Sequence, residues 1–284
     1  MIRAHDLGVK GEENIVNKLC ELGLDGVQLV AYKSIEGVSY AEGGLDPLRA
    51  REIGRVIRDA GMEVALVGAY FNPVHPNTEK AQRGERIFAE YLSLASALGA
   101  CVVGSETGSL MGDPWGFHPD NSSLEARGTV VKTFGRLADI AKNHGACIGI
   151  EGAYNHICQT PDVLYGVIRD IGRDNVRVIF DLYNYLSDAN YESAYDILDR
   201  GHELFGSDIL LYHVKDLVIK DGKISQCGVG RGILDYGRII PEIYQRNPNA
   251  ILVLEGTVGD DIPYAVDYLR GIIEKTEQQR KASE

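Results

Sequence analysis

Short apolar runs and longer amphipathic stretches alternate along this chain. In stretches such as 12–23, apolar residues recur at helical spacing, and Ile15, Leu19 and Leu22 share one face. Four apolar runs have the length of a strand that is buried on both faces: 147–150, 176–180, 209–212 and 251–254. This alternation is typical of an α/β protein in which helices cover a parallel sheet.

Start and stop signals divide the chain into eight strand-then-helix units. At Asp46-Pro47 and Thr160-Pro161, a capping residue is followed by proline in the first helical position. Besides the four runs above, we expect strands at 2–7, 27–30, 62–70 and 101–104. We expect helices near 12–23, 47–61, 78–98, 123–144, 192–205 and 262–279, and two more that begin at 161 and 235.

Eight repeats of this unit favour one closed (β/α)₈ barrel over an open sheet. We therefore predict a single barrel domain over residues 1–284, without a linker. Two short polar-apolar stretches flank Asp221-Gly222, which suits a type I′ turn. Residues 217–227 are accordingly predicted to form a small hairpin outside the barrel strands.

The four apolar runs lead directly into ionisable residues, either at their ends or one position beyond: Glu151, Asp181, His213 and Glu255. These residues are 30, 32 and 42 positions apart, about one strand-helix unit each, and the hairpin accounts for the longer last interval. Parallel strands end at the same mouth of a barrel, where sites are built. Three carboxylates and one imidazole suit a hard divalent cation, so this set predicts a metal centre.

Charge and composition narrow the partners. The chain has 29 Lys and Arg against 41 Asp and Glu, giving a net charge of −12, and no concentrated basic stripe. Such a surface repels a phosphate backbone, which argues against nucleic acid and anionic membranes as partners. Five cysteines without a CxxC spacing, no N-terminal signal and no long apolar run lead us to expect a cytoplasmic protein.

A metal at this mouth would bridge the carbonyl oxygen and a neighbouring hydroxyl of a sugar and acidify the adjacent C–H. Glu151 and Glu255 would then move the proton through an enediolate, while Asp181 and His213 act as ligands only. The sequence thus predicts a metal-dependent sugar isomerase or epimerase.

The chain resembles the xylose-isomerase-like TIM-barrel superfamily in its ligand motifs and in their order. These motifs are IGIEG, VIFDLYN, YHVKD and LVLEG. The sugar isomerases and epimerases of this superfamily include ketose 3-epimerases, hydroxypyruvate isomerase and inosose dehydratase relatives. The glycine-rich stretch 228–240 resembles the family as well. The resemblance implies a divalent metal, with Mn²⁺ expected first and Mg²⁺, Co²⁺ or Zn²⁺ as alternatives, and a homo-dimer or homo-tetramer.

Two positions depart from the pattern that the resemblance implies. Asn184 stands where many members have a histidine three residues after the aspartate ligand. Ile157 stands where ketose 3-epimerases carry a glutamate for the terminal hydroxyl of the substrate, with His156 beside it. Metal binding should survive both changes, whereas the identity of the sugar, and whether it is phosphorylated or oxidised, stays open.

Further residues at the expected mouth are candidates for substrate binding: Glu106, His118, His156, Asn184, Lys215, Asp216 and Arg231. Each has a plainer alternative. Lys215 and Asp216 could form an ion pair, His118 could lie on the surface, and Arg231 could belong to a flexible glycine-rich connection.

Three other functions compete with the isomerase. A lyase or dehydratase acting on a 3-oxo-sugar or inosose-type substrate would begin with the same proton abstraction. An endonuclease IV-like repair enzyme shares part of the ligand set, but Asn184 and the acidic charge argue against it. A non-catalytic sugar-binding subunit is the third alternative.

Overall fold

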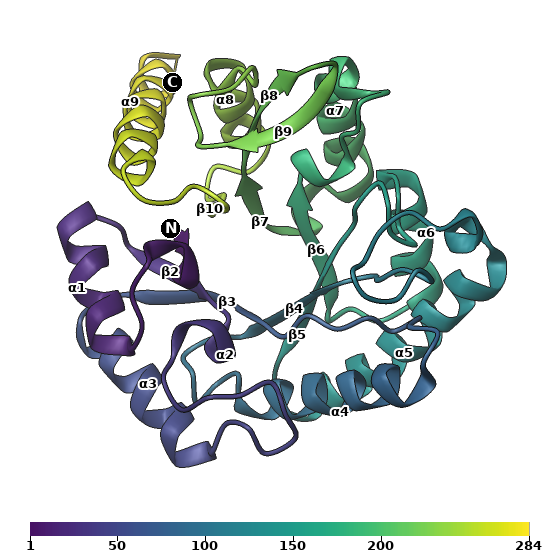
Figure 1. The fold of residues 1–284 in the computed structure, drawn as a ribbon. Coiled ribbons are helices and arrows are strands. Elements are labelled where there is room, and N and C mark those ends of the chain that lie inside the picture. The colour runs from purple at the N-terminus through teal and green to yellow at the C-terminus, as the bar shows by residue number, and fades with distance from the viewer. Residues whose placement is uncertain (284) are drawn as a thin grey trace.

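Within residues 1–283, which the computed structural model describes, eight parallel strands close into a barrel in the order β1-β10-β7-β6-β5-β4-β3-β2 (Figure 1). The barrel strands are β1 Ile2–Arg3, β2 Gly26–Leu29, β3 Glu63–Gly68, β4 Val102–Glu106, β5 Cys147–Glu151, β6 Val176–Asp181, β7 Ile209–Val214 and β10 Leu252–Leu254. This architecture confirms the predicted (β/α)₈ class. The first strand is shorter than expected, because residues 4–7 turn into a 3₁₀ helix in which Asp6 pairs with Arg3.

Helices surround the barrel (Figure 1). Their bounds are α1 Glu12–Leu22, α2 Ala31–Ser34, α3 Pro47–Asp59, α4 Thr78–Leu94, α5 Leu124–Asn143, α6 Pro161–Ile171, α7 Ala194–Phe205, α8 Tyr236–Arg246 and α9 Asp261–Ser283. Single 3₁₀ turns are η1 Ala4–Leu7, η2 Pro119–Ser122, η3 Tyr183–Tyr185, η4 Tyr191–Ser193 and η5 Gly206–Asp208. The caps work as the sequence indicates: Asp46 accepts from the amides of Leu48 and Arg49, and Thr160 accepts from that of Val163. Among the described residues, no helix is long and apolar enough to cross a membrane.

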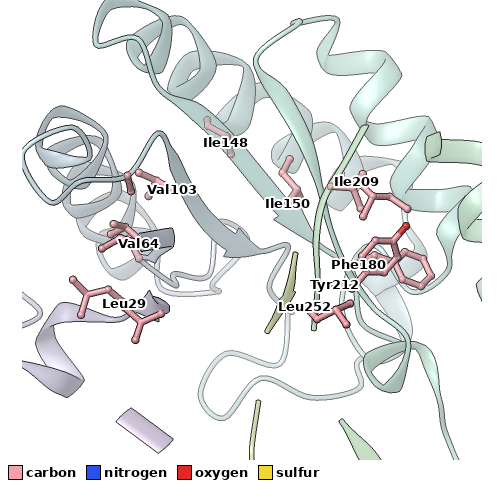
Figure 2. Close-up of a cluster of buried hydrophobic side chains, with 14 of the residues drawn as sticks. Leu29, Val64, Val103, Ile148, Ile150, Phe180, Ile209, Tyr212 and Leu252 are labelled. Atoms are coloured by element: carbon pink, nitrogen blue, oxygen red, sulfur yellow. The ribbon is translucent and has the colours of Figure 1, made fainter. Parts of the chain in front are cut away.

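Two hydrophobic layers hold the barrel. Outward-facing strand residues such as Val103, Ile148 and Phe180 pack beneath the helices (Figure 2). Inside the barrel, Leu66, Val102, Ile179, Leu211 and Val253 form a smaller cluster. Burying each such side chain contributes about 1.5–3 kcal/mol. The interior layer fills the barrel below the ligand residues and leaves its C-terminal mouth to polar groups.

Strand register places charged residues side by side at the mouth. Glu106 on β4 is opposite Glu151 on β5, and Asp181 on β6 is opposite His213 on β7. Gly104 and Gly149, register partners below, leave room for Ile179, whose Cδ1 would lie within 2.8 Å of a Cβ at either position. The close fit around Ile179 fixes the interior layer beneath the charged residues of the mouth.

Strands β8 (Asp216–Lys220) and β9 (Lys223–Cys227) form an antiparallel hairpin after β7. At its turn, both Asp221 and Gly222 have positive φ, 50° and 74°, as a type I′ turn requires. The amide of Ile224 donates to Oδ1 of Asp188 at 2.7 Å, which ties the hairpin to the loop after β6.

Candidate metal centre

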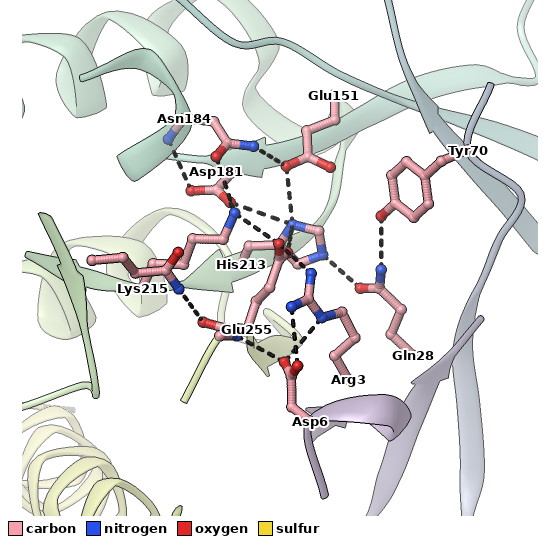
Figure 3. A network of polar contacts seen from close by, with 12 residues as sticks. Arg3, Asp6, Gln28, Tyr70, Glu151, Asp181, Asn184, His213, Lys215 and Glu255 are labelled. Carbon is pink, nitrogen blue, oxygen red and sulfur yellow. Dashed lines mark hydrogen bonds and ion pairs between the residues drawn. The ribbon is translucent and has the colours of Figure 1, made fainter. Parts of the chain in front are cut away.

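Four side chains meet at the barrel mouth: Glu151, Asp181 and His213 from the strands β5, β6 and β7, and Glu255 from the position directly after β10 (Figure 3). One ligand atom from each lies within 4.8 Å of the others. The Nδ1 atom of His213 is 3.2 Å from Glu151, 3.6 Å from Asp181 and 3.0 Å from Glu255. Since all four residues are buried, the cluster gathers three carboxylates in a place of low solvent access.

Gln28 on β2 orients the imidazole. The Nε2 atom of His213 lies 2.6 Å from Oε1 of Gln28, and the amide nitrogen of Gln28 donates to the Tyr70 hydroxyl at 2.8 Å (Figure 3). Because Gln28 presents its oxygen, Nε2 carries a hydrogen and Nδ1 is the atom that faces the carboxylates. The only sign of this role in the sequence is a polar residue inside the apolar strand GVQL.

Two cations compensate part of the negative charge. The Nζ atom of Lys215 lies 2.7 Å from Asp181 and 2.8 Å from Oε1 of Glu255. Arg3 on β1 reaches the same Glu255 oxygen at 2.6 Å and is itself held by both oxygens of Asp6. Arg3 lies far from the ligand motifs in sequence, and the sequence-based prediction missed it.

The protonation of the cluster follows from these contacts. Burial by itself would lower the pKa of His213, but Glu255 and Glu151 raise it well above its ordinary value. Burial would raise the pKa of Glu255, but Lys215 and His213 hold it well below the usual range. Burial raises the pKa of Glu151. Without a metal, the imidazole therefore carries a proton among the carboxylates.

The donor set fits a divalent cation. Oδ2 of Asp181 and Oε2 of Glu255 are buried and accept no hydrogen bond of normal geometry from residues 1–283. Two positive groups are nevertheless close: Nζ of Lys215 is 2.7 Å from Oδ2 of Asp181, and Nδ1 of His213 is 3.0 Å from Oε2 of Glu255. A buried carboxylate oxygen without a hydrogen-bond donor destabilises the fold unless a cation binds it. The cluster could therefore bind a divalent metal through Glu151, Asp181, His213 and Glu255.

Asn184 links the ligands rather than replacing one. Its side-chain nitrogen donates to Oε1 of Glu151 at 2.6 Å, and its side-chain oxygen accepts from Lys215 at 3.0 Å. Its backbone amide donates to Oδ1 of Asp181 at 3.2 Å. Each contact holds a carboxylate or a cation of the cluster in place, which is how outer groups tune a metal site.

A cavity of about 490 Å³, called the mouth pocket below, adjoins the cluster. Its lining comprises Glu106, Trp115, Ala153, Tyr154, Asn155, His156, Tyr183, Asn184, Leu186, Asp188, Lys223 and Ile224. Removal from water, and then repulsion by Glu151, raises the pKa of Glu106 to about 8. Burial lowers the pKa of His156 to about 4, so this imidazole is neutral at neutral pH. The pocket wall therefore offers a protonated carboxyl and a neutral imidazole.

Four of the residues expected to bind substrate do not line this pocket. One of them, Lys215, belongs to the cluster itself. The buried carboxylate of Asp216 accepts from four backbone amides, those of Leu217, Gly230, Gly232 and Leu234. Asp216 thus holds the glycine-rich loop in shape. Arg231 is exposed, pairs with Asp261 and stacks over Tyr264. His118 accepts from the amide of Asp120 at the start of η2.

Comparisons with known proteins agree with the fold. The family described as xylose isomerase-like TIM barrel matches residues 16–272. A solved structure of L-ribulose 3-epimerase is similar at a TM-score of 0.74 and 14% identity, over 99% of this chain and 96% of that one. A D-tagatose 3-epimerase-like protein gives 0.73 and 16%, over 93% of each chain.

Metal appears in the description of other similar structures. A xylose isomerase-like protein from Mycobacterium smegmatis in complex with magnesium has a TM-score of 0.70 and 16% identity, covering 93% of this chain and 88% of its own. The IOLI protein with a zinc atom has 0.69 and 13%, covering 97% and 95%. Among curated proteins, no sequence matches this chain.

Proposed function

This chain belongs to the xylose isomerase-like TIM barrel family, and from that premise we propose that it is a divalent-metal-dependent sugar isomerase or epimerase. The observation that carries the proposal is that each of the four residues brings a ligand atom within 4.8 Å of the others. Within residues 1–283, Oδ2 of Asp181 and Oε2 of Glu255 are also buried and accept no hydrogen bond. A polar pocket lined by Asn184, which donates to Glu151 of the cluster, supports a small, hydroxyl-rich substrate.

Glu151, Asp181, His213 and Glu255 would hold the metal, and we propose Mn²⁺ as the resident ion. When bound, such an ion would polarise a sugar carbonyl and acidify the neighbouring C–H. Elemental analysis of the purified protein tests the identity of the metal. Tight retention of zinc, with activity only in the zinc form, would contradict the choice of Mn²⁺.

The contacts favour Glu151 as the group that removes the proton. Oε1 of Glu255 is engaged by Arg3 and Lys215. Its Oε2 accepts no hydrogen bond of normal geometry within residues 1–283 but lies 3.0 Å from Nδ1 of His213. In Glu151, Oε1 is engaged by Asn184 and His213, whereas Oε2 has no hydrogen-bond partner within residues 1–283 (Figure 3). A free carboxylate oxygen beside the substrate is what a general base needs. Glu255 then serves mainly as a ligand, although the sequence suggested proton transfer by both glutamates.

Other polar groups around the cluster complete the reaction site. Asn184 would keep Glu151 in its orientation, and Lys215 would offer its ammonium to developing negative charge on a substrate oxygen. Glu106 and His156, at the wall of the mouth pocket, would bind substrate hydroxyls. We retain no proposal of substrate contact for Asp216, because backbone amides occupy its carboxylate.

Solvent deuterium exchange tests the proton abstraction directly. Metal-loaded protein is incubated in D₂O with ketoses and 3-oxo-glycosides, and NMR follows the signal of the C–H beside each carbonyl. We expect exchange in at least one substrate, and its loss by more than about 100-fold in Glu151→Gln. Glu13→Gln, at an exposed position on α1, is the matched control. Absence of exchange in every sugar by the metal-loaded wild type would overturn the proposal.

A lyase is the second candidate, favoured by one observation. Glu106 lies opposite Glu151 in the strand register and has a pKa of about 8, so it keeps a proton at neutral pH. A leaving oxygen requires such a proton donor after the neighbouring C–H is broken. Product analysis separates the two reactions, because the lyase releases a second molecule from a 3-oxo-sugar conjugate and the isomerase does not.

A further inference from the structure

The mouth pocket is larger than one monosaccharide requires. Its volume of about 490 Å³ falls in the range of roughly 300–1,000 Å³ that encloses drug-sized molecules. A sugar ring held at the metal cluster would fill only the part next to Glu106 and Asn184. The remaining space has to be explained by another part of the substrate.

The pocket has an inner and an outer part. Asn184, at the inner part, contacts Glu151 of the metal cluster. The outer part is formed by Lys223 and Ile224 of β9, and Ile224 is fixed to Asp188 by a hydrogen bond of 2.7 Å. The hairpin therefore supplies a wall that no metal ligand or base requires.

Aromatic side chains line the space between these parts. Trp115, Tyr154 and Tyr183 all face the pocket, and Tyr154 is 44% exposed. The loop that carries Trp115 also exposes Met111 by 50% and Phe117 by 69%. Aromatic faces attract the polarised C–H groups of a sugar ring and stack on flat rings. Since Met111 and Phe117 do not line the pocket, the residues that indicate a stacking ligand are Trp115, Tyr154 and Tyr183.

Buried polar contacts hold this aromatic wall in place. Asn121 is buried, accepts from the amide of Leu110 and donates to the carbonyl of Asn155 at 2.8 Å. The hydroxyl of Ser109 donates to the carbonyl of Gly116. These bonds join the Trp115 loop to the segment that carries Tyr154, so the outer part is formed before any ligand binds. A preformed wall lowers the cost of ordering a ligand on it.

Building on the function proposed above, we propose that the substrate is a 3-oxo-glycoside. Its oxidised sugar ring lies at the metal cluster, and its second ring lies in the outer part of the mouth pocket. Trp115 and Tyr154 stack on the second ring, and the hairpin at Ile224 covers its edge. The second ring is either another sugar or an aromatic aglycone, since both offer a flat or C–H-rich face to these side chains.

Trp115 is the one tryptophan of the chain, so its fluorescence reports directly on this wall. Mn²⁺-loaded protein is titrated with the 3-oxo forms of methyl and phenyl glycosides in gluco, galacto and xylo configuration, and with a 3-oxo disaccharide of each parent sugar. We expect a second ring to tighten binding at least about tenfold over the methyl glycoside in one configuration, with a change in Trp115 emission. Comparing the affinity of the phenyl ligands with that of the disaccharides shows whether the second ring is an aromatic aglycone or another sugar.

Titration calorimetry on variants shows whether the tighter binding of two-ring ligands comes from the aromatic wall of the pocket. Tyr154→Ala and Trp115→Ala should each reduce the preference for two rings by about threefold or more, while Trp115→Phe retains most of it. Tyr165→Ala, on the exposed face of α6, is the matched control, and circular dichroism verifies folding.

Equal affinity for methyl glycosides and two-ring ligands in every configuration would overturn the inference and leave the proposed function standing. Absence of binding by all ligands would overturn it as well. The deuterium-exchange experiment on free ketoses then decides separately whether the isomerase proposal fails too.

Discussion

The Nε2 atom of His213 lies 2.6 Å from Oε1 of Gln28, on the side of the ring that faces away from the carboxylates. Gln28 is 185 positions away in sequence, and Tyr70, just after the end of β3, holds its amide. The imidazole is thereby locked with Nδ1 toward the metal cluster. A residue outside the cluster thus decides which nitrogen of His213 faces the three carboxylates.

Loss of this lock should weaken the metal site. Gln28→Met removes the acceptor at similar side-chain size, and we expect metal affinity to fall about 10–100-fold. Titration calorimetry with Mn²⁺ on metal-free protein measures the change. Gln245→Met, at an exposed position on α8, controls for the substitution itself. An unchanged affinity in Gln28→Met would mean that packing alone orients His213.

Metal should stabilise the fold through the cluster. At free Mn²⁺ about 100 times its Kd, the gain is about 2.7 kcal/mol, which corresponds to a Tm increase of several degrees. In Glu255→Gln the increase should largely vanish, because one buried ligand oxygen is lost. Thermal unfolding of chelator-treated protein with and without metal provides the measurement, with exposed Glu274→Gln as its control. An unchanged Tm of the wild type on adding metal would contradict the proposed metal site.

Lys215 should have opposite effects on the metal-free protein and on metal binding. Its ammonium is buried between Asp181 and Glu255, so Lys215→Met leaves two close carboxylates without their cation. We expect the free energy of unfolding of metal-free protein to drop by about 3–5 kcal/mol. Metal affinity should rise, since a competing positive charge is gone.

Urea denaturation and metal titration of the same Lys215→Met sample test both parts. Lys215→Arg keeps the positive charge, so both the loss of stability and the gain in metal affinity should be smaller than in Lys215→Met. A variant that is equally stable without metal and binds it no more tightly would show that Lys215 contributes little to the charge balance of the cluster.

His156 should make the protein less stable in mild acid. Burial lowers its pKa from 6.5 to about 4, so in the folded state it resists protonation. Below pH 6.5 the unfolded chain binds a proton that the folded chain does not, and stability falls as the pH drops toward 4. Between pH 7 and pH 5 this group accounts for a loss of about 2 kcal/mol.

Urea unfolding at pH 7, 6 and 5 checks the contribution of His156. His156→Gln should flatten the pH dependence by that amount, whereas His144→Gln, at an exposed site on the C-terminal end of α5, should not. Identical slopes for the wild type and His156→Gln would contradict the assignment.

The sequence alone predicted the barrel and the residue types that close four of its strands. Apolar runs that end in Glu151, Asp181 and His213 are local patterns, and the rule that parallel strands end at one mouth brings them together without coordinates. Local signals also predicted the caps at Asp46 and Thr160, because a cap depends on neighbours within three residues.

Only the tertiary structure decided how those groups are held and what surrounds them. Gln28 and Arg3 reach His213 and Glu255 across the barrel, and nothing in their local sequence reveals a partner about 185 or 252 positions away. The same holds for Asp216, whose carboxylate is taken by backbone amides of a loop that folds back on it. Periodicity determines which face of a strand a residue occupies, whereas hydrogen bonds and charge pairing depend on distances that exist only after the barrel closes.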